Sequence, residues 1–69
     1  MRISARNQLA GTVVEVTKGA TTAHVRVEIA SGQVITAAIT NQAVEELGLA
    51  KGKRATVVIK ASDVMVAVD

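Results

Sequence analysis

An arginine, a hydroxyl and a carboxamide stand within four residues at the start of the chain, in the stretch Ser4-Ala5-Arg6-Asn7. Ser4 and Arg6 are two positions apart, so in an extended segment their side chains point to the same side. Together they offer hydrogen-bond donors, namely five guanidinium N–H groups and a rotatable hydroxyl. Such a set suits a small, fully deprotonated oxyanion, which only accepts hydrogen bonds. The plain alternative is that both are solvated residues on a frayed N-terminus.

Two further stretches have donors for the same kind of ligand. Lys60 ends a predicted strand, and Ala61 and Ser62 then leave the ladder, which frees their backbone N–H groups to point at a ligand. Thr40 stands where a strand runs into a helix, whose unpaired N–H groups and dipole favour anions. A solvated lysine at a strand end and ordinary helix capping by Thr40 are the simpler interpretations of these two stretches.

The sequence contains no catalytic or cation-binding constellation that we recognise. His24 is the only histidine and lacks both a second ligand-type neighbour and a nucleophile at a recognisable spacing. Glu45 and Glu46 are adjacent on a predicted helix and so point apart, and the other acids are scattered. Lys51-Gly52-Lys53 is a turn that matches no phosphate-binding loop. We therefore expect no enzyme activity and no metal cation.

Hydrophobic periodicity indicates the elements that position these groups. We expect five strands and one helix capped by Thr40 or Asn41, over the ranges Leu9–Lys18, Thr22–Ile29, Gln33–Ile39, Asn41–Leu47 (the helix), Arg54–Lys60 and Val64–Val68. Gly11 predicts a bulge or a close backbone approach in the first strand. Val44 and Leu47 form the apolar stripe of the helix, which Gly48 closes. The order β-β-β-α-β-β indicates an all-β single domain over residues 1–69 with one short helix, a small five-stranded, partly open barrel of OB-like type.

The amino-acid composition predicts that this small barrel associates with further copies of the chain. Almost half of the residues are apolar, yet there is no Phe, Tyr or Trp and no Cys, so the core is aliphatic and no disulfide staples it. A domain of this size buries only about 60% of its unfolded surface. The first strand is apolar on both sides, with Leu9 and Val13 opposite Val14 and Val16, and must be covered on both faces. We expect a homo-oligomer.

The same composition disfavours other partners and compartments. The net charge is only +2, because basic and acidic residues nearly balance, and this disfavours a polyanion as partner. An OB-like barrel without aromatic stacking platforms is also a poor binder of single-stranded nucleic acid. No stretch approaches the roughly 20 apolar residues of a membrane span. The first residues contain no apolar region typical of an export signal, so we expect a cytoplasmic protein.

Taken together, these stretches resemble the molbindin (Mop) family, a domain also found as the molybdate-binding module of molybdenum-responsive regulators and of some molybdate transporter ATPases. The residues that carry the resemblance run essentially from end to end: Ser4-Ala5-Arg6-Asn7-Gln8-Leu9, Gly11-Thr12-Val13, Ala38-Ile39-Thr40, Leu47-Gly48-Leu49, Lys51-Gly52 and Val58-Ile59-Lys60-Ala61-Ser62-Asp63-Val64-Met65. The opening tetrapeptide and the lysine stretch at that separation are the specific part of the match.

The resemblance implies binding and storage of molybdate or tungstate by a hexamer of three dimers, with anion sites between subunits. The ligands that it implies are Ser4, Arg6, Thr40, Lys60, Ala61 and Ser62, the last two through their backbone. It also implies a second anion site on the threefold axis, near Lys18, Gly19, Ala20, Thr21 and Thr22. Some family members have a serine where this chain has Ala43, so we expect weaker binding there or greater reliance on Thr40 and backbone amides.

Other functions remain open at this point. One is a regulatory module that senses the oxyanion within a larger regulator or transporter ATPase, although the start at Met1 and the end at Asp69 favour a free-standing protein. The other is an OB-like nucleic-acid binder, which the lack of aromatic residues disfavours.

Overall fold

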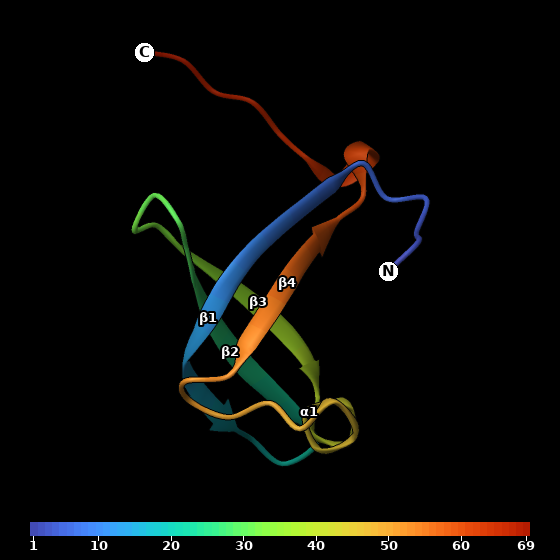
Figure 1. Cartoon of the computed structure of the whole chain (residues 1–69), viewed down its shortest axis with the longest axis vertical. Helices are drawn as coiled ribbons and strands as arrows, with labels where there is room; N and C mark the ends of the chain where they lie inside the picture. The colour runs from blue at the N-terminus through green and yellow to red at the C-terminus, as the bar shows by residue number, and fades with distance from the viewer.

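In the computed structural model, which describes residues 1–69, four antiparallel strands form one curled sheet with a short helix at one end (Figure 1). The elements are β1 (Asn7–Lys18), β2 (Thr22–Ile29), β3 (Val34–Thr40), α1 (Asn41–Leu47), β4 (Arg54–Ile59) and a 3₁₀ turn, η1 (Ala61–Asp63). The strand order is β3-β2-β1-β4, so β3 and β4 are the edges. The all-β class with one helix is confirmed, and the sheet is a half-barrel with four strands rather than five.

The core lies on one face of the central strand β2. Its inward residues Ala23, Val25 and Val27 are buried, while the intervening polar residues are exposed, as the alternation predicted. Val13 from β1 and Val44 from α1 complete this small aliphatic cluster. Such a core leaves much apolar surface outside it.

β1 lies between β4 and β2, and its ladder with β2 contains an irregularity at Val14. Its first half pairs with β4, from Asn7 to Thr12, and the register with β2 shifts between Val13 and Glu15. The extra residue brings Val16 to the core side, which Val13 occupies before it. Gly11 is not the bulge but the close approach, because a Cβ there would lie 2.5 Å from the Glu28 carbonyl oxygen.

The helix α1 has the predicted bounds and caps. The backbone N–H of Ala43 donates to Thr40 Oγ1 at 3.0 Å, and Gly48 adopts φ 64° at the other end. Val44 is buried as expected, but Leu47 is 60% exposed and does not join the core. With only seven residues, the helix seats one side chain in the core, and Leu47 lies over a groove that the chain leaves open.

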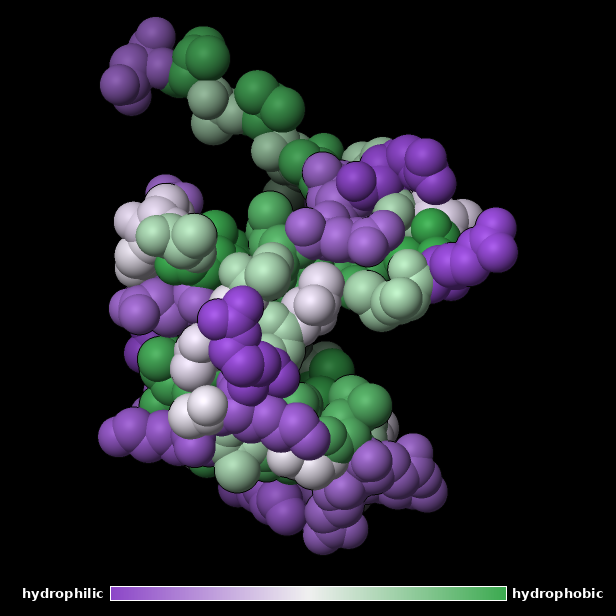
Figure 2. Space-filling model, viewed as in Figure 1, coloured by the Kyte–Doolittle hydropathy of each residue, from purple (hydrophilic) through white to green (hydrophobic).

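The predicted fifth strand, Val64–Val68, does not form. After η1 the chain runs away from the sheet as an extended, apolar tail, which Figure 2 shows projecting from the body. Met65, Val66 and Val68 are each at least 90% exposed. The reason is geometric, since η1 turns the chain outward and no strand of its own sheet lies beside the tail. Neither helical segment has the length and apolar character needed to cross a bilayer.

Candidate functional site

The opening motif and the lysine stretch lie together at one end of the sheet. Asn7, the first residue of β1, pairs with Ile59, the last residue of β4. Arg6 and Lys60 are the next residues outward on these two neighbouring strands, and both lie at the end opposite α1 (Figure 1). Two cationic side chains 54 positions apart in the sequence are thus brought to the same end of the molecule by strand pairing.

The backbone after β4 presents unused donors, as predicted. Asp63 N–H donates to the Lys60 carbonyl at 2.9 Å and Val64 N–H to the Ala61 carbonyl at 3.2 Å, which forms the single turn η1. The first N–H groups of a helical turn have no partner within it, and those of Ala61 and Ser62 donate to no other acceptor in the chain. They are exposed and therefore open to an anionic ligand.

The segment before β1 differs from the extended arrangement expected for it. The chain bends at Ser4 and at Arg6, and Arg6 Nε donates to the Ser4 backbone carbonyl at 2.9 Å. The guanidinium therefore folds toward Ser4 while its two Nη groups stay free. No carboxylate pairs with Arg6 or Lys60, because the two ion pairs of the chain are Lys18–Glu45 and Arg26–Glu15. Arg6 and Lys60 are therefore both without an ion-pair partner in the chain, although Asp63 of η1 lies at the same end.

Thr40 lies at the opposite end of the sheet. It pairs with Thr22 at the start of β2, next to the end of β1. Nearly the whole of β1 separates it from Arg6, about twelve residues at roughly 3.3 Å each. One chain therefore brings Ser4, Arg6, Lys60, Ala61 and Ser62 together but does not bring Thr40 to them. The predicted ligand residues are therefore divided between the two ends of the sheet.

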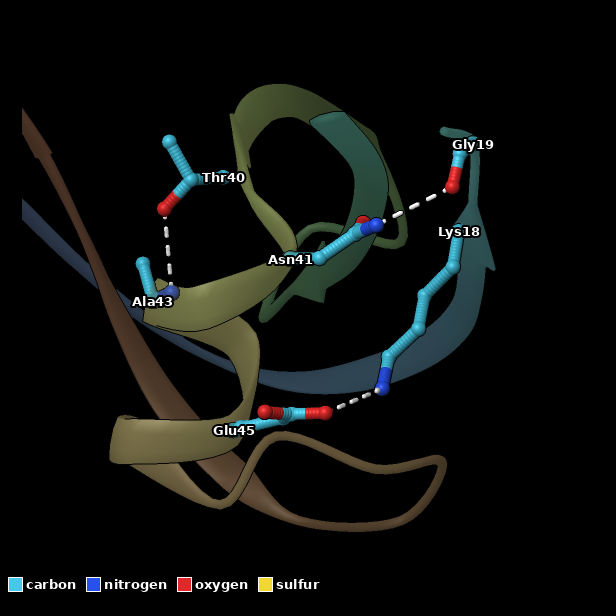
Figure 3. Close-up of polar contacts among 6 residues, drawn as sticks. All are labelled: Lys18, Gly19, Thr40, Asn41, Ala43 and Glu45. Atoms are coloured by element: carbon cyan, nitrogen blue, oxygen red, sulfur yellow. Dashed lines mark hydrogen bonds and ion pairs between the residues drawn. The ribbon is translucent and has the colours of Figure 1, made fainter. Parts of the chain in front are cut away.

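The stretch Lys18–Thr22 lies beside the start of α1. Figure 3 shows Lys18 and Gly19 on the right of the view and Thr40 on the left, while Thr22, at the end of the stretch, pairs directly with Thr40. Lys18 Nζ is 3.4 Å from Glu45 Oε1, and Asn41 holds the turn by donating from its side chain to the Gly19 carbonyl at 3.0 Å and from its backbone to Thr21. The turn is exposed and well anchored, and its lysine has a carboxylate partner rather than a free charge.

An apolar groove of about 650 Å³ runs over the inner face of the half-barrel. Aliphatic side chains of all four strands line it together with Met1, Leu47 and Leu49, and its only polar residues are Lys53, Arg54 and Thr56. No segment of the same chain fills the groove. Within the chain, no group of three or more His, Cys, Asp or Glu side chains is placed to hold a metal ion.

Sequence reasoning named Asn7 and Asn41 but did not predict the long-range hydrogen bonds by which they organise these regions. Asn41 anchors the turn at Gly19 across 22 positions, and Asn7 donates from Nδ2 to the Ile59 carbonyl at 3.2 Å across 52 positions. A single asparagine in a sequence does not reveal which distant carbonyl it reaches. Only the strand pairing, once known, places these carbonyls beside the two carboxamides.

Comparison with known sequences identifies a domain family and relatives that are named for molybdenum. Residues 3–66 match the TOBE domain. The chain is 54% identical over 66 residues to molybdenum-pterin-binding protein 1 of Clostridium pasteurianum, covering 96% of this chain and 97% of the relative. It is also 48% identical to the molybdenum transport protein ModE of Herbaspirillum seropedicae, where the match covers 96% of this chain but 24% of that longer protein.

Solved structures agree with the fold. MopII from Clostridium pasteurianum superimposes with a TM-score of 0.91 at 51% identity, with 97% of this chain and 100% of that chain covered. The cytoplasmic molybdate-binding protein ModG, with molybdate bound, also gives 0.91 at 48% identity, with 94% of this chain and 46% of that chain covered. The resemblance inferred from the opening motif and the lysine stretch is therefore confirmed over nearly the whole sequence, and the chain belongs to the TOBE domain family.

Proposed function

We propose that this protein binds molybdate or tungstate in the cytoplasm and stores it, without catalysis, at sites formed between copies of the chain. The observation that carries the proposal is the end of the sheet where Arg6 and Lys60 follow the paired residues Asn7 and Ile59, neither cation is paired with a carboxylate, and the N–H groups of Ala61 and Ser62 are unpaired. Every one of these groups donates hydrogen bonds or carries positive charge. The relatives named for molybdenum or molybdate support the choice of ligand.

The chemistry of the ligand matches this set of donors. Molybdate at neutral pH is a tetrahedral dianion with four acceptor oxygens and no proton. Arg6 can hold two of its oxygens, and Lys60 supplies the second positive charge, which limits the cost of burying the dianion. Hydrogen phosphate keeps a proton and needs an acceptor, so a site of donors disfavours it. Sulfate is rejected only by size, and tungstate nearly matches molybdate.

A second copy is needed because one chain leaves the site open. All six predicted ligand residues are exposed in the single chain, and Thr40 lies at the far end of the sheet. Hydrogen bonds to an anion gain strength when water is excluded. Thr40 of a second copy, placed against Arg6 and Lys60 of the first, would both add a donor and exclude solvent.

Apolar surface supports the same assembly. The tail Val64–Val68 is unpaired, with Met65, Val66 and Val68 almost fully exposed, and the groove over the half-barrel is open, with Met1 as its only N-terminal lining residue before β1. The tail of one copy has the aliphatic character that fits the groove or the bare edge of another. We place these contacts in the hexamer of three dimers that the family resemblance implies. The Lys18–Thr22 turns would then surround the threefold axis as a second anion site.

The structure does not favour a pterin as the ligand, although the relatives in Clostridium pasteurianum are named for both molybdenum and pterin. A pterin is a flat heteroaromatic with ring N–H and amino donors, which proteins satisfy with carboxylates and stacked aromatic rings. The groove has no carboxylate in its lining, and the chain has no aromatic residue. The donor-rich end of the sheet fits the oxyanion instead.

A second role, oxyanion sensing within a larger regulator, is favoured by one observation. The chain matches a quarter of the ModE protein and under half of the ModG chain, so the same domain occurs inside longer proteins. Sensing and storage use the same site and differ in what the domain is attached to. Finding these residues within a longer reading frame would favour sensing over storage.

The proposal is tested by calorimetric titration of the protein with molybdate, tungstate, sulfate and phosphate at physiological salt. Saturable heat with molybdate and tungstate is expected, together with a higher unfolding temperature, since ligand at 100 times its Kd adds about 2.7 kcal/mol of stability. Native mass spectrometry then counts chains and bound anions. No heat with molybdate, or preference for phosphate, would overturn the proposal.

A further inference from the structure

We infer that Asn7 is the positioning residue that holds the two strand ends of the anion site together. The inference rests on the proposed function, because it concerns how Arg6 and Lys60 are placed for the oxyanion. Asn7 itself donates its side chain to a backbone carbonyl and stands at the inner margin of the site, so it acts through its neighbours rather than on the ligand.

Asn7 stands at the end of the ladder between β1 and β4. Asn7 and Ile59 are the last paired residues of β1 and β4, and beyond them the two strands have no further pairing. The last pair of a ladder frays most readily, since it is supported from one side only. The binding residues Arg6 and Lys60 are attached directly to this last pair, so its fraying would separate them.

The side chain of Asn7 adds a second link between the same two strands. Asn7 Nδ2 donates to the Ile59 carbonyl at 3.2 Å in a partly buried setting. Strand pairing and this carboxamide thus hold the same two residues, and the carboxamide reaches the carbonyl immediately before Lys60. The backbone from Lys60 to Ser62 begins at that carbonyl, and the unpaired N–H groups follow within three residues.

Gln8 provides a matched contrast in the same chain. It is the next residue, has the same carboxamide chemistry, and also donates to a backbone carbonyl, that of Ala5 at 3.1 Å. That bond is exposed and local, spanning three positions, and does not reach β4. Loss of the Gln8 side chain therefore leaves the link between the two strand ends intact, whereas loss of the Asn7 side chain removes it.

The experiment compares Asn7→Ala with Gln8→Ala in the assembled protein by calorimetry with molybdate and by ¹⁵N order parameters at Lys60, Ala61 and Ser62. We expect Asn7→Ala to weaken molybdate binding by roughly tenfold, in line with the loss of residues that orient ligands. Its order parameters at these three residues should fall, and its assembled mass should be unchanged. Gln8→Ala should match the parent in both measurements.

A double-mutant cycle separates positioning from a general effect on the fold. If Asn7 acts through Lys60, then Asn7→Ala should cost much less affinity in a Lys60→Ala background than in the parent. Equal losses in both backgrounds, or unchanged order parameters at Lys60, would overturn the inference while leaving the proposed function standing. If the parent failed to bind molybdate, the proposed function would fall and the inference with it, even with altered order parameters.

Discussion

The guanidinium of Arg6 is tied to the backbone of Ser4, because Arg6 Nε donates to the Ser4 carbonyl at 2.9 Å. This bond uses the edge of the guanidinium that faces its own chain and leaves the two Nη groups for a ligand. Ser4 therefore contributes in two ways, because its backbone carbonyl at the bend orients Arg6 and its side chain offers a hydroxyl. Substituting the Ser4 side chain leaves that backbone bond in place.

Arg6→Ala should therefore lose more molybdate affinity than Ser4→Ala, with Arg6→Lys between them. Ser4→Ala removes one hydrogen bond to a charged partner, about 1.5–3 kcal/mol. Arg6→Ala removes a bidentate pair and a counter-charge, about 2–5 kcal/mol, or roughly 30- to 4000-fold. Lysine restores the charge without the fork. Calorimetry on the three variants checks the order, and undiminished binding by Arg6→Ala would place the ligand elsewhere.

Thr40→Val should reduce both stability and binding, because the Thr40 hydroxyl has two uses. Its oxygen accepts the Ala43 N–H at 3.0 Å, so its proton is left to donate outward to an anion. Loss of the cap should cost about 1 kcal/mol and lower the unfolding temperature by roughly 4–8 °C. Thr40→Ser retains both bonds and serves as the control in calorimetry and thermal unfolding. A valine variant equal to the parent in both would contradict these assignments.

Gly11→Ala should destabilise the fold without any change at the anion site. A Cβ at this position would lie 2.5 Å from the Glu28 carbonyl oxygen and 2.8 Å from Val27 Cγ1, and the carbonyl belongs to a paired strand that cannot move aside freely. We expect a loss of about 1–3 kcal/mol, measured as a lower urea midpoint. Ala30→Ser, in the exposed hairpin turn, should leave the midpoint unchanged.

Val66→Asp should prevent assembly while leaving each chain folded. Val66 is 90% exposed and does not belong to the core, so a carboxylate there should change the folding stability of the isolated chain little. Burying that charge against the aliphatic groove of a second copy would be unfavourable. Native mass spectrometry should show single chains in place of the oligomer proposed for the parent. An oligomer of unchanged mass would mean that the tail lies outside the interface.

Local patterns in the sequence were sufficient for the elements whose burial follows a simple period. β2 alternates through Ala23, Val25 and Val27 as predicted, because a central strand with one buried face leaves no other arrangement. α1 begins at Asn41 and ends at Leu47 because Thr40 and Gly48 cap it chemically. Signals of this kind are contained within a few neighbouring residues.

Features that depend on distant partners could not be predicted in the same way. The irregularity at Val14 arises where β1 leaves β4, and the loop residues Gly52 and Lys53 bond there to Val13 instead. Val64–Val68 has a strand-like pattern, but a strand forms only beside a partner, and the chain offers none. The candidate ligand residues were proposed from their types, whereas their division between the two ends of β1 required the topology.

The separation of Arg6 and Thr40 by the length of β1 has a consequence for mixtures of chains. Arg6→Ala and Thr40→Val each damage a different end of the molecule. When the two variants are unfolded together and refolded, some interfaces unite two damaged ends, while others unite an intact Arg6 end with an intact Thr40 end. Sites that neither variant forms alone would reappear in the mixed assembly, as in complementation between two defective alleles.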